Sequence, residues 1–400
     1  MTDTSVAQQN ASLARKVLRG FANPVAWIAF LGCAPLLALR ILPLLHFNHP
    51  GDFALYWSAG SLFLAGDNPY SSHAMLAFEL SHGWPFVHPM MFCPPWVLPF
   101  AALAAAFSYH GARLGWLAIS FLLDCISCIA LWRYFGGEFR RAWIAVAFVA
   151  TFLPMAAAEY LGQITPLVLV SLVIFLFLLR HERDYASGLM LLGVGLKPHL
   201  LYLVLLAVLL WAVQHRRWKM IAGAITSYSV AIGAVFIYNP RTLTYLHNSV
   251  GPATQVLTGA GGVLRGLFGA QHAWLQFLPT IAGLGWFLFY WLRLRHRWDW
   301  EEHLPLLVLV SLCSAPYYWY HDFLLVAPAL IYIAVRMKDR LPLLIPGWLL
   351  VQCGILFCAH VSAALEATAG LVWIGFYFYA RAVRARNYSP QRLGENESAV

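Results

Sequence analysis

The chain has 400 residues, of which 61% are hydrophobic and only 11% are charged, and its mean hydropathy is +0.67. Soluble globular proteins do not carry so few charges over such a length. The formal net charge of +9 would suit nucleic-acid binding, but an excess of Lys and Arg on the cytoplasmic side of a membrane protein explains it more simply. The composition therefore predicts an all-α, polytopic membrane protein with no nucleic-acid partner.

Apolar runs long enough to cross a membrane recur along the whole chain. We expect twelve spans, at residues 24–45, 113–132, 142–158, 164–180, 185–197, 199–213, 220–238, 275–292, 304–317, 322–336, 341–358 and 361–380. They form one transmembrane domain, residues 24–380, between a cytoplasmic N-terminal tail, 1–23, and a cytoplasmic C-terminal tail, 381–400. The short pair 185–197 and 199–213 is ambiguous, because it can equally be one helix kinked at Pro198.

The distribution of positive charge supports this topology. With the N-terminus inside, all but five of the 26 Lys and Arg residues lie on the cytoplasmic side. The five outer ones are Arg40, Arg113, Lys197, Arg241 and Arg265. We therefore expect a multi-pass protein of the plasma or inner membrane with both termini in the cytoplasm.

Two long segments, 46–112 and 239–274, then face outward. Residues 92–108 are apolar but rich in proline, which favours a re-entrant or interfacial segment, and residues 75–80 predict a short helix lying flat on the membrane. The glycines of the second segment do not form a nucleotide-binding pattern, because no strand precedes them, so a flexible loop is expected. They are Gly259, Gly261, Gly262 and Gly266.

Polar residues inside or beside the apolar runs gather on the outer side in this topology. They are Asp52, Glu159, Gln163, Lys197, His199, His321 and Asp322. Ionisable groups at such positions indicate a functional site. Four segments that are far apart in sequence are thus expected to converge at one membrane level.

Each of these residues also has a structural explanation. Asp52 can cap a helix that starts near residue 53, Glu159 can pair with Lys197, and Gln163 can satisfy a helix end. Lys197 can extend to the lipid headgroups or bind a phosphate. His321 beside Asp322 can be an interfacial aromatic with a capping neighbour, or it can orient an acceptor or contact a phosphate.

No sequence pattern predicts a metal or redox site. The chain has no HExxH motif, and Cys125 and Cys128 merely share one helix face. The acidic run Asp299-Trp300-Glu301-Glu302 resembles a metal–nucleotide clamp, but it lies on the cytoplasmic side between Arg297 and His303, where a solvated charged face is expected.

Several short patterns resemble those of glycosyltransferase family 87, in the same order along roughly residues 50–335. The opening pattern consists of Asp52, Tyr56, Ala59, Gly66, Pro69 and Tyr70. The later ones are Gly162-Gln163, Asp184 with Ala186-Ser187-Gly188, Leu196-Lys197-Pro198, Arg216-Arg217-Trp218, and Pro316 with Trp319 and His321. The chain departs from the family at Cys93, where a tyrosine usually precedes two prolines, so no donor contact is carried over to that side chain.

The resemblance implies a GT-C type fold and a hexosyltransferase, with mannose the expected sugar, that uses a polyprenyl-phosphate donor and a lipid or glycan acceptor at the outer face. It implies that Asp52 is the catalytic carboxylate and that Lys197 and His321 are candidates for the donor phosphate. Tyr56, Glu159, Gln163, His199 and Asp322 are further candidates for donor or acceptor binding. A single base predicts an inverting displacement, and no metal or other cofactor is expected.

A secondary transporter is the main alternative. Twelve spans, a broken helix around Lys197-Pro198 and intramembrane Glu159 would all suit one. A transporter needs its ionisable residues near the bilayer midplane and a repeat between the two halves of the chain, and no convincing repeat is found. A non-catalytic lipid-binding or assembly subunit is a second alternative.

Overall fold

A computed structural model describes most of the chain. The described residues are 51–84, 91–244, 258–337, 345–354 and 368–386. Every regular element in these ranges is helical, as the composition predicts. The first expected span, 24–45, and the N-terminal tail lie outside the described residues, as do parts of the last two expected spans and most of the C-terminal tail.

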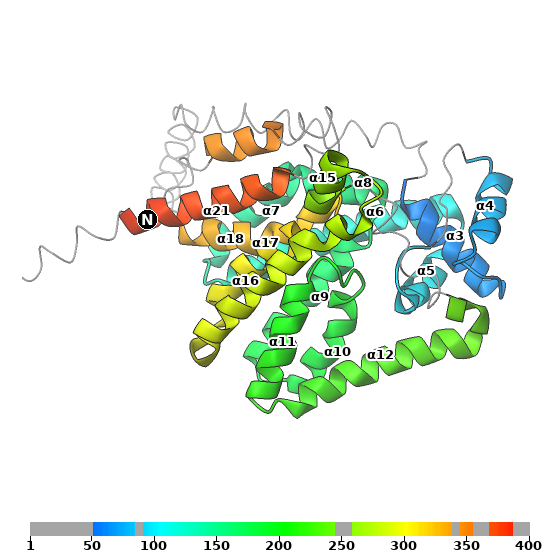
Figure 1. Cartoon of the computed structure of the whole chain (residues 1–400), viewed down its shortest axis with the longest axis horizontal. Coiled ribbons are helices and arrows are strands. Elements are labelled where there is room, and N and C mark those ends of the chain that lie inside the picture. The colour runs from blue at the N-terminus through cyan, green and yellow to red at the C-terminus, as the bar shows by residue number, and fades with distance from the viewer. Residues whose placement is uncertain (1–50, 85–90, 245–257, 338–344, 355–367, 387–400) are drawn as a thin grey trace, which may run out of the picture.

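The helices form a bundle with an extension on one side (Figure 1). The bundle contains α6 (Tyr109–Tyr134), α7 (Trp143–Thr151), α8 (Leu153–Leu161), α9 (Thr165–Arg180), α10 (Asp184–Val194), α11 (Tyr202–Gln214), α15 (Gly259–Phe268), α16 (Leu278–Leu294), α17 (Trp300–Cys313), the 3-10 helix η7 (Tyr320–Val326), α18 (Ala327–Arg336) and α21 (Thr368–Arg386). A further apolar helix covers Ile345–Gly354.

The extension consists of the short helices α3 (Phe53–Leu64), α4 (Ser72–Ser81) and α5 (Leu98–Ala105). The long helix α12 (Trp218–Tyr238) runs from α10 and α11 to this extension (Figure 1). At its end, the Asn239 side chain donates to the Asp67 carbonyl at 2.6 Å and Arg241 pairs with the Asp67 carboxylate at 3.2 Å. The described part of the first expected outer segment is therefore helical and is attached to the end of α12.

In the described parts of the chain, fewer helices are long enough to span a membrane than the apolar runs suggest. Among the described residues, three are long and apolar enough, Tyr109–Tyr134, Trp218–Tyr238 and Ala273–Arg297. The helices α10 and α11 have 11 and 13 residues, and at 1.5 Å per residue they extend about 16 and 20 Å, short of a hydrocarbon core of about 30 Å. The twelve-span topology therefore stays a prediction.

The expected span 142–158 is not one straight helix. It divides at Phe152 into α7 and α8, and the two segments are bent by 60°. Pro154 lies in the first turn of α8, where its missing N–H and fixed φ fit a new helix start but not a helix interior. The Leu153 amide at this start donates to Oε1 of Gln352 at 3.3 Å. If the pair crosses the membrane, it makes a fourth, broken span.

Two other sequence expectations are refined. The ambiguous region 185–213 is two helices, α10 and α11, joined by residues 195–201 that include Lys197. The glycine-rich segment expected to be a flexible loop is instead helix α15. Gly261 explains the difference, because a Cβ there would lie 2.3 Å from the carbonyl oxygen of Gln276. Glycine thus allows a close helix contact that local sequence does not reveal.

The other short apolar segments form the helices that the sequence suggests. Residues 95–105 form η2 (Pro95–Val97) followed by α5, which together are too short to cross the bilayer alone. The expected interfacial helix lies within α4, where Met75 is buried and Leu76 and Leu80 are exposed.

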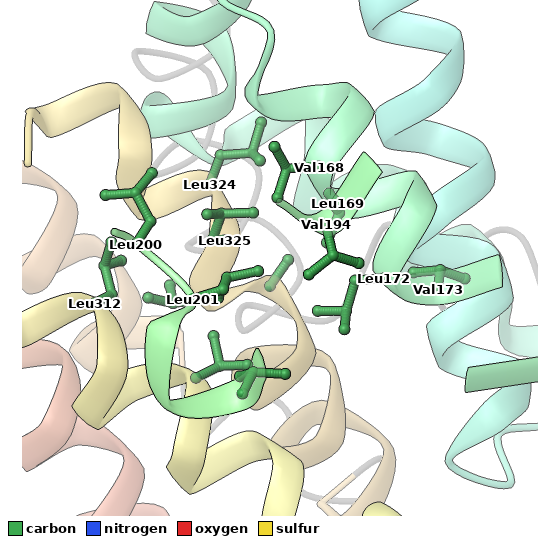
Figure 2. Packing of buried hydrophobic residues seen from close by; sticks show 14 of the residues in the cluster. Val168, Leu169, Leu172, Val173, Val194, Leu200, Leu201, Leu312, Leu324 and Leu325 are labelled. Atoms are coloured by element: carbon green, nitrogen blue, oxygen red, sulfur yellow. The ribbon is translucent and has the colours of Figure 1, made fainter. Parts of the chain in front are cut away.

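The core unites the elements that lead to the candidate site. Buried leucines and valines from α9, α10, the 195–201 connection, α17 and η7 point toward one another (Figure 2). Those labelled there are Val168, Leu169, Leu172, Val173, Val194, Leu200, Leu201, Leu312, Leu324 and Leu325. Because these residues are 0–3% exposed, the core fixes the positions of the residues that adjoin it at one end of the bundle.

Candidate functional site

Four separate segments meet around the side chain of Gln163. Its Nε2 donates to Oδ2 of Asp52, and its Oε1 accepts from the Tyr56 hydroxyl at 3.1 Å and from Nζ of Lys197 at 2.7 Å. Lys197 also donates to Oδ1 of Asp322 at 2.7 Å. We call these residues the Gln163 cluster, and include Thr165, whose hydroxyl donates to the same Asp322 oxygen at 3.3 Å.

Two glycines bring Asp52 and Gln163 together. Gly51 has φ +60°, and a Cβ there would lie 2.9 Å from the Leu161 carbonyl oxygen. Gly162 ends α8 in the left-handed conformation, and a Cβ there would lie 2.5 Å from Cβ of Phe53. Both positions therefore require glycine for conformation and for space. The segment before α3 and the turn after α8 pack backbone against backbone.

Asp52 occupies the N-cap position of α3, but its side chain makes no capping hydrogen bond. The carboxylate of Asp52 therefore does not cap α3. Its Oδ2 accepts a hydrogen bond from Gln163 instead. Asp52 is partly exposed whereas Lys197 and Asp322 are buried. Its carboxylate can therefore receive a proton from a group that approaches from outside the protein.

Lys197 and Asp322 form a buried ion pair, with only 8% and 2% of their side chains exposed. The second Asp322 oxygen accepts from the Trp319 amide at 3.0 Å. Among the described residues, Lys197 pairs with Asp322 and not with Glu159. Glu159 lies on α8 and is 6% exposed, and its predicted part in binding stays a prediction.

The two histidines lie beside this pair. His199 stacks on Tyr317 with ring centroids 4.1 Å apart, and Nε2 of His321 lies 3.7 Å from Oδ1 of Asp322. Burial lowers the pKa of His321 below its ordinary value. Its imidazole is therefore neutral near pH 7, so a contact of His321 to phosphate would be a hydrogen bond and not an ion pair.

Cys93 also belongs to this region. Its carbonyl accepts from the Tyr70 hydroxyl at 2.9 Å, and its thiol lies close to the Tyr56 hydroxyl. The residue that departs from the family pattern thus adjoins the Gln163 cluster through Tyr56.

Three contributors to the cluster were not predicted. Thr165 gave a weak signal, as a hydroxyl two residues after Gln163. Trp116 of α6 donates its indole N–H to the Gln163 carbonyl at 3.2 Å, and Trp319 contributes only its backbone amide. A backbone donor leaves no mark in the sequence, so the Trp319 contact could not have been found without the fold.

A second group of charges lies at the opposite end of α9. Glu301 pairs with Arg180 at 2.8 Å and with Arg336 at 3.3 Å. Glu302 pairs with Arg336 at 3.1 Å and accepts from the Tyr332 hydroxyl at 2.6 Å. We call these five residues the Glu301 network. Its charged side chains are 25–42% exposed, which fits the expected solvated charged face.

The described residues contain no cluster of three or more His, Cys, Asp or Glu side chains that could bind a metal ion. The two carboxylates of the Gln163 cluster already accept from nitrogen donors. Cys125 and Cys128 lie on α6 with their thiols reduced.

Comparison with known proteins gives one result. The model of glycosyltransferase family 87 matches residues 92–328, more than half of the chain. The match includes Gln163, Lys197 and Asp322, and it begins after Asp52 and Tyr56. Comparisons with curated proteins and with solved structures gave no match. The family match, together with the apolar helices, shows that this chain belongs to glycosyltransferase family 87 and is a membrane glycosyltransferase.

Proposed function

We propose that the protein transfers a hexose, with mannose the expected sugar, from a polyprenyl-phosphate carrier to a lipid or glycan acceptor at the outer membrane face. The single observation that carries the proposal is the contact of a base candidate, Asp52, and a cation, Lys197, with the same amide. A glycosyl transfer from a phosphate donor needs both groups at one place.

In the proposed reaction, Asp52 accepts the proton of the acceptor hydroxyl. The acceptor oxygen forms a bond to the anomeric carbon while the bond from that carbon to the phosphate oxygen breaks, and its electron pair leaves with the polyprenyl phosphate. Because one carboxylate acts and no covalent sugar intermediate forms, the anomeric configuration is inverted. A positioned general base contributes roughly 10²- to 10⁴-fold to the rate.

The leaving phosphate gains negative charge as the bond breaks. Lys197 supplies a buried ammonium with two of its three N–H bonds already directed to Gln163 and Asp322, which leaves the third for a phosphate oxygen. A neutral His321 supplies a hydrogen bond. Tyr56, Glu159, His199 and Asp322 remain candidates for donor or acceptor contacts. This scheme needs no divalent metal, so a chelator should leave the rate unchanged.

The distribution of charge and the nature of the carrier support the proposed outer-face site. The Gln163 cluster lies where α8 and α10 end and α9 and α11 begin, whereas the opposite ends carry Arg180, Arg183, Arg216 and Arg217. Arginine-rich ends favour the cytoplasm. A polyprenyl chain stays in the bilayer, since each buried methylene contributes ~0.8 kcal/mol, so its phosphate must be bound at headgroup level. The position of the cluster at helix ends suits a phosphate bound at headgroup level better than it suits a transporter, whose substrate site lies near the bilayer midplane.

The proposal is tested by offering purified protein two donors, a polyprenyl-phosphate hexose and a nucleotide hexose, with a membrane lipid and glycan extract as acceptor. We expect sugar transfer from the lipid-linked donor only, and a raised apparent KM for that donor in Lys197→Ala. Transfer from the nucleotide sugar alone, or an unchanged donor KM in the variant, contradicts the proposal. Mass spectrometry of lipids and glycans from cells with and without the gene identifies the acceptor.

A further inference from the structure

We infer that Gln163 is a positioning residue that couples the catalytic base to the donor-binding cation by bonding to both through one amide. The inference rests on the proposed function, and it assigns Gln163 a role other than direct substrate binding. It means that Asp52 and Lys197 cannot move independently while the amide contacts remain.

The chemistry of the two partners fixes the orientation of the amide. An ionised carboxylate only accepts hydrogen bonds and an ammonium only donates them. Nε2 must therefore face Asp52 and Oε1 must face Lys197, as observed. If the amide were rotated by 180°, its N–H groups would face the ammonium N–H groups of Lys197, and its oxygen would face the carboxylate oxygen of Asp52. Gln163 thus has one orientation that satisfies both charged groups.

The backbone of Gln163 is equally constrained. Its amide donates to the Ala158 carbonyl at 2.8 Å, and its carbonyl accepts from the Trp116 indole at 3.2 Å. The preceding residue, Gly162, packs against Phe53. The residue is 5% exposed, and its Oε1 already accepts two hydrogen bonds. A side chain that is buried and saturated on its acceptor oxygen is suited to position its neighbours.

The substitution Gln163→Glu tests this role because it changes little in size. Its new carboxylate can still accept from Lys197 and Tyr56, but it cannot donate to Asp52 when ionised. Lys197 keeps the new group ionised, so a proton shared by the two carboxylates would reside on Asp52 and inactivate the base. Activity would then return only at higher pH.

The other titratable groups around Asp52 must be considered in such an experiment. They include Tyr56, Cys93 and His321, with Lys197 and Asp322 of the same cluster. All are unchanged in the variant, so a shift relative to wild type reports on position 163.

The experiment measures kcat and the donor KM from pH 5.5 to 9 for wild type, Gln163→Glu, Gln163→Met and a matched control, Gln214→Glu. Gln214 is exposed at the far end of α11, where it donates to the Arg295 carbonyl. In Gln163→Glu we expect the acidic midpoint of the kcat profile to rise by at least about one pH unit. Below that midpoint, kcat should fall about tenfold for each pH unit. The control should keep the wild-type midpoint.

Gln163→Met serves where the Glu variant folds poorly, because it removes the N–H to Asp52 without adding charge, and it should raise the same midpoint by a smaller amount. Unshifted midpoints in the Gln163 variants overturn the inference, even if kcat falls uniformly. The proposed function fails separately, if wild type transfers no hexose from the lipid-linked donor or if Asp52→Asn stays active.

Discussion

The two charged groups at opposite ends of α9 differ in burial. The Gln163 cluster contains a Lys–Asp pair that is 8% and 2% exposed, whereas the Glu301 network keeps its carboxylates and guanidinium groups 25–42% exposed. The two ends are about 22 Å apart along the helix. Removing ions from water costs several kcal/mol per ion, whereas exposed pairs cost and contribute little. The buried Lys197–Asp322 pair is therefore better explained by a functional role than by a contribution to stability.

The largest difference between the ends should appear when one ion is removed. Lys197→Met leaves Asp322 buried without its cation, and we expect about 3–5 kcal/mol of destabilisation. Adding Asp322→Asn should restore most of this stability without restoring sugar transfer. Thermal unfolding in detergent measures both effects. A double variant as unstable as the single one would mean that the charge is not the cause.

A second, smaller effect concerns the backbone contact beneath the cluster. Gly162→Ala introduces strain at φ +75° and a Cβ 2.5 Å from Phe53, so we expect a loss of at least about 2 kcal/mol and a lower kcat.

Gly136→Ala is the matched control, because its φ is +85° but nothing lies within 4 Å of the added Cβ. It should cost about 1 kcal/mol and leave kcat unchanged. Equal unfolding temperatures for the two variants would show that the Phe53 contact is unimportant.

The smallest effect is expected in the Glu301 network. Glu301→Gln removes two partly exposed ion pairs, and such pairs contribute about 0–1 kcal/mol each. Its unfolding temperature should differ little from wild type, and less still at 1 M salt, where the screening length falls to about 3 Å. A loss comparable to that of Lys197→Met would mean that the two ends are energetically alike.

The sequence allowed the charged residues to be found but not their partners. Asp52 and Lys197 are conspicuous because ionisable groups are rare in an apolar chain. The choice of Asp322 over Glu159 as the partner of Lys197 depends on how the 195–201 connection packs against η7. No periodicity in one segment contains that information.

Helix boundaries show the same limit. Pro154 was a visible signal for the break at Phe152, but hydropathy alone favoured a continuous span. Helix α15 was not expected because several glycines in a short segment usually indicate a loop. Gly261 is there because it contacts the Gln276 backbone, which belongs to a separate segment and cannot be recognised from the local sequence. Apolar runs also include connecting residues, so in the described parts of the chain they outnumber the helices that are long enough to cross.

The most direct test of the central claim compares the two ends in one assay of hexose transfer from the polyprenyl-phosphate donor, per folded molecule. Asp52→Asn should lose at least about 10²-fold in turnover, because the asparagine amide cannot accept the acceptor's proton, while Glu301→Gln stays within about twofold of wild type. Undiminished turnover in Asp52→Asn would contradict the assignment of catalysis to the Gln163 cluster.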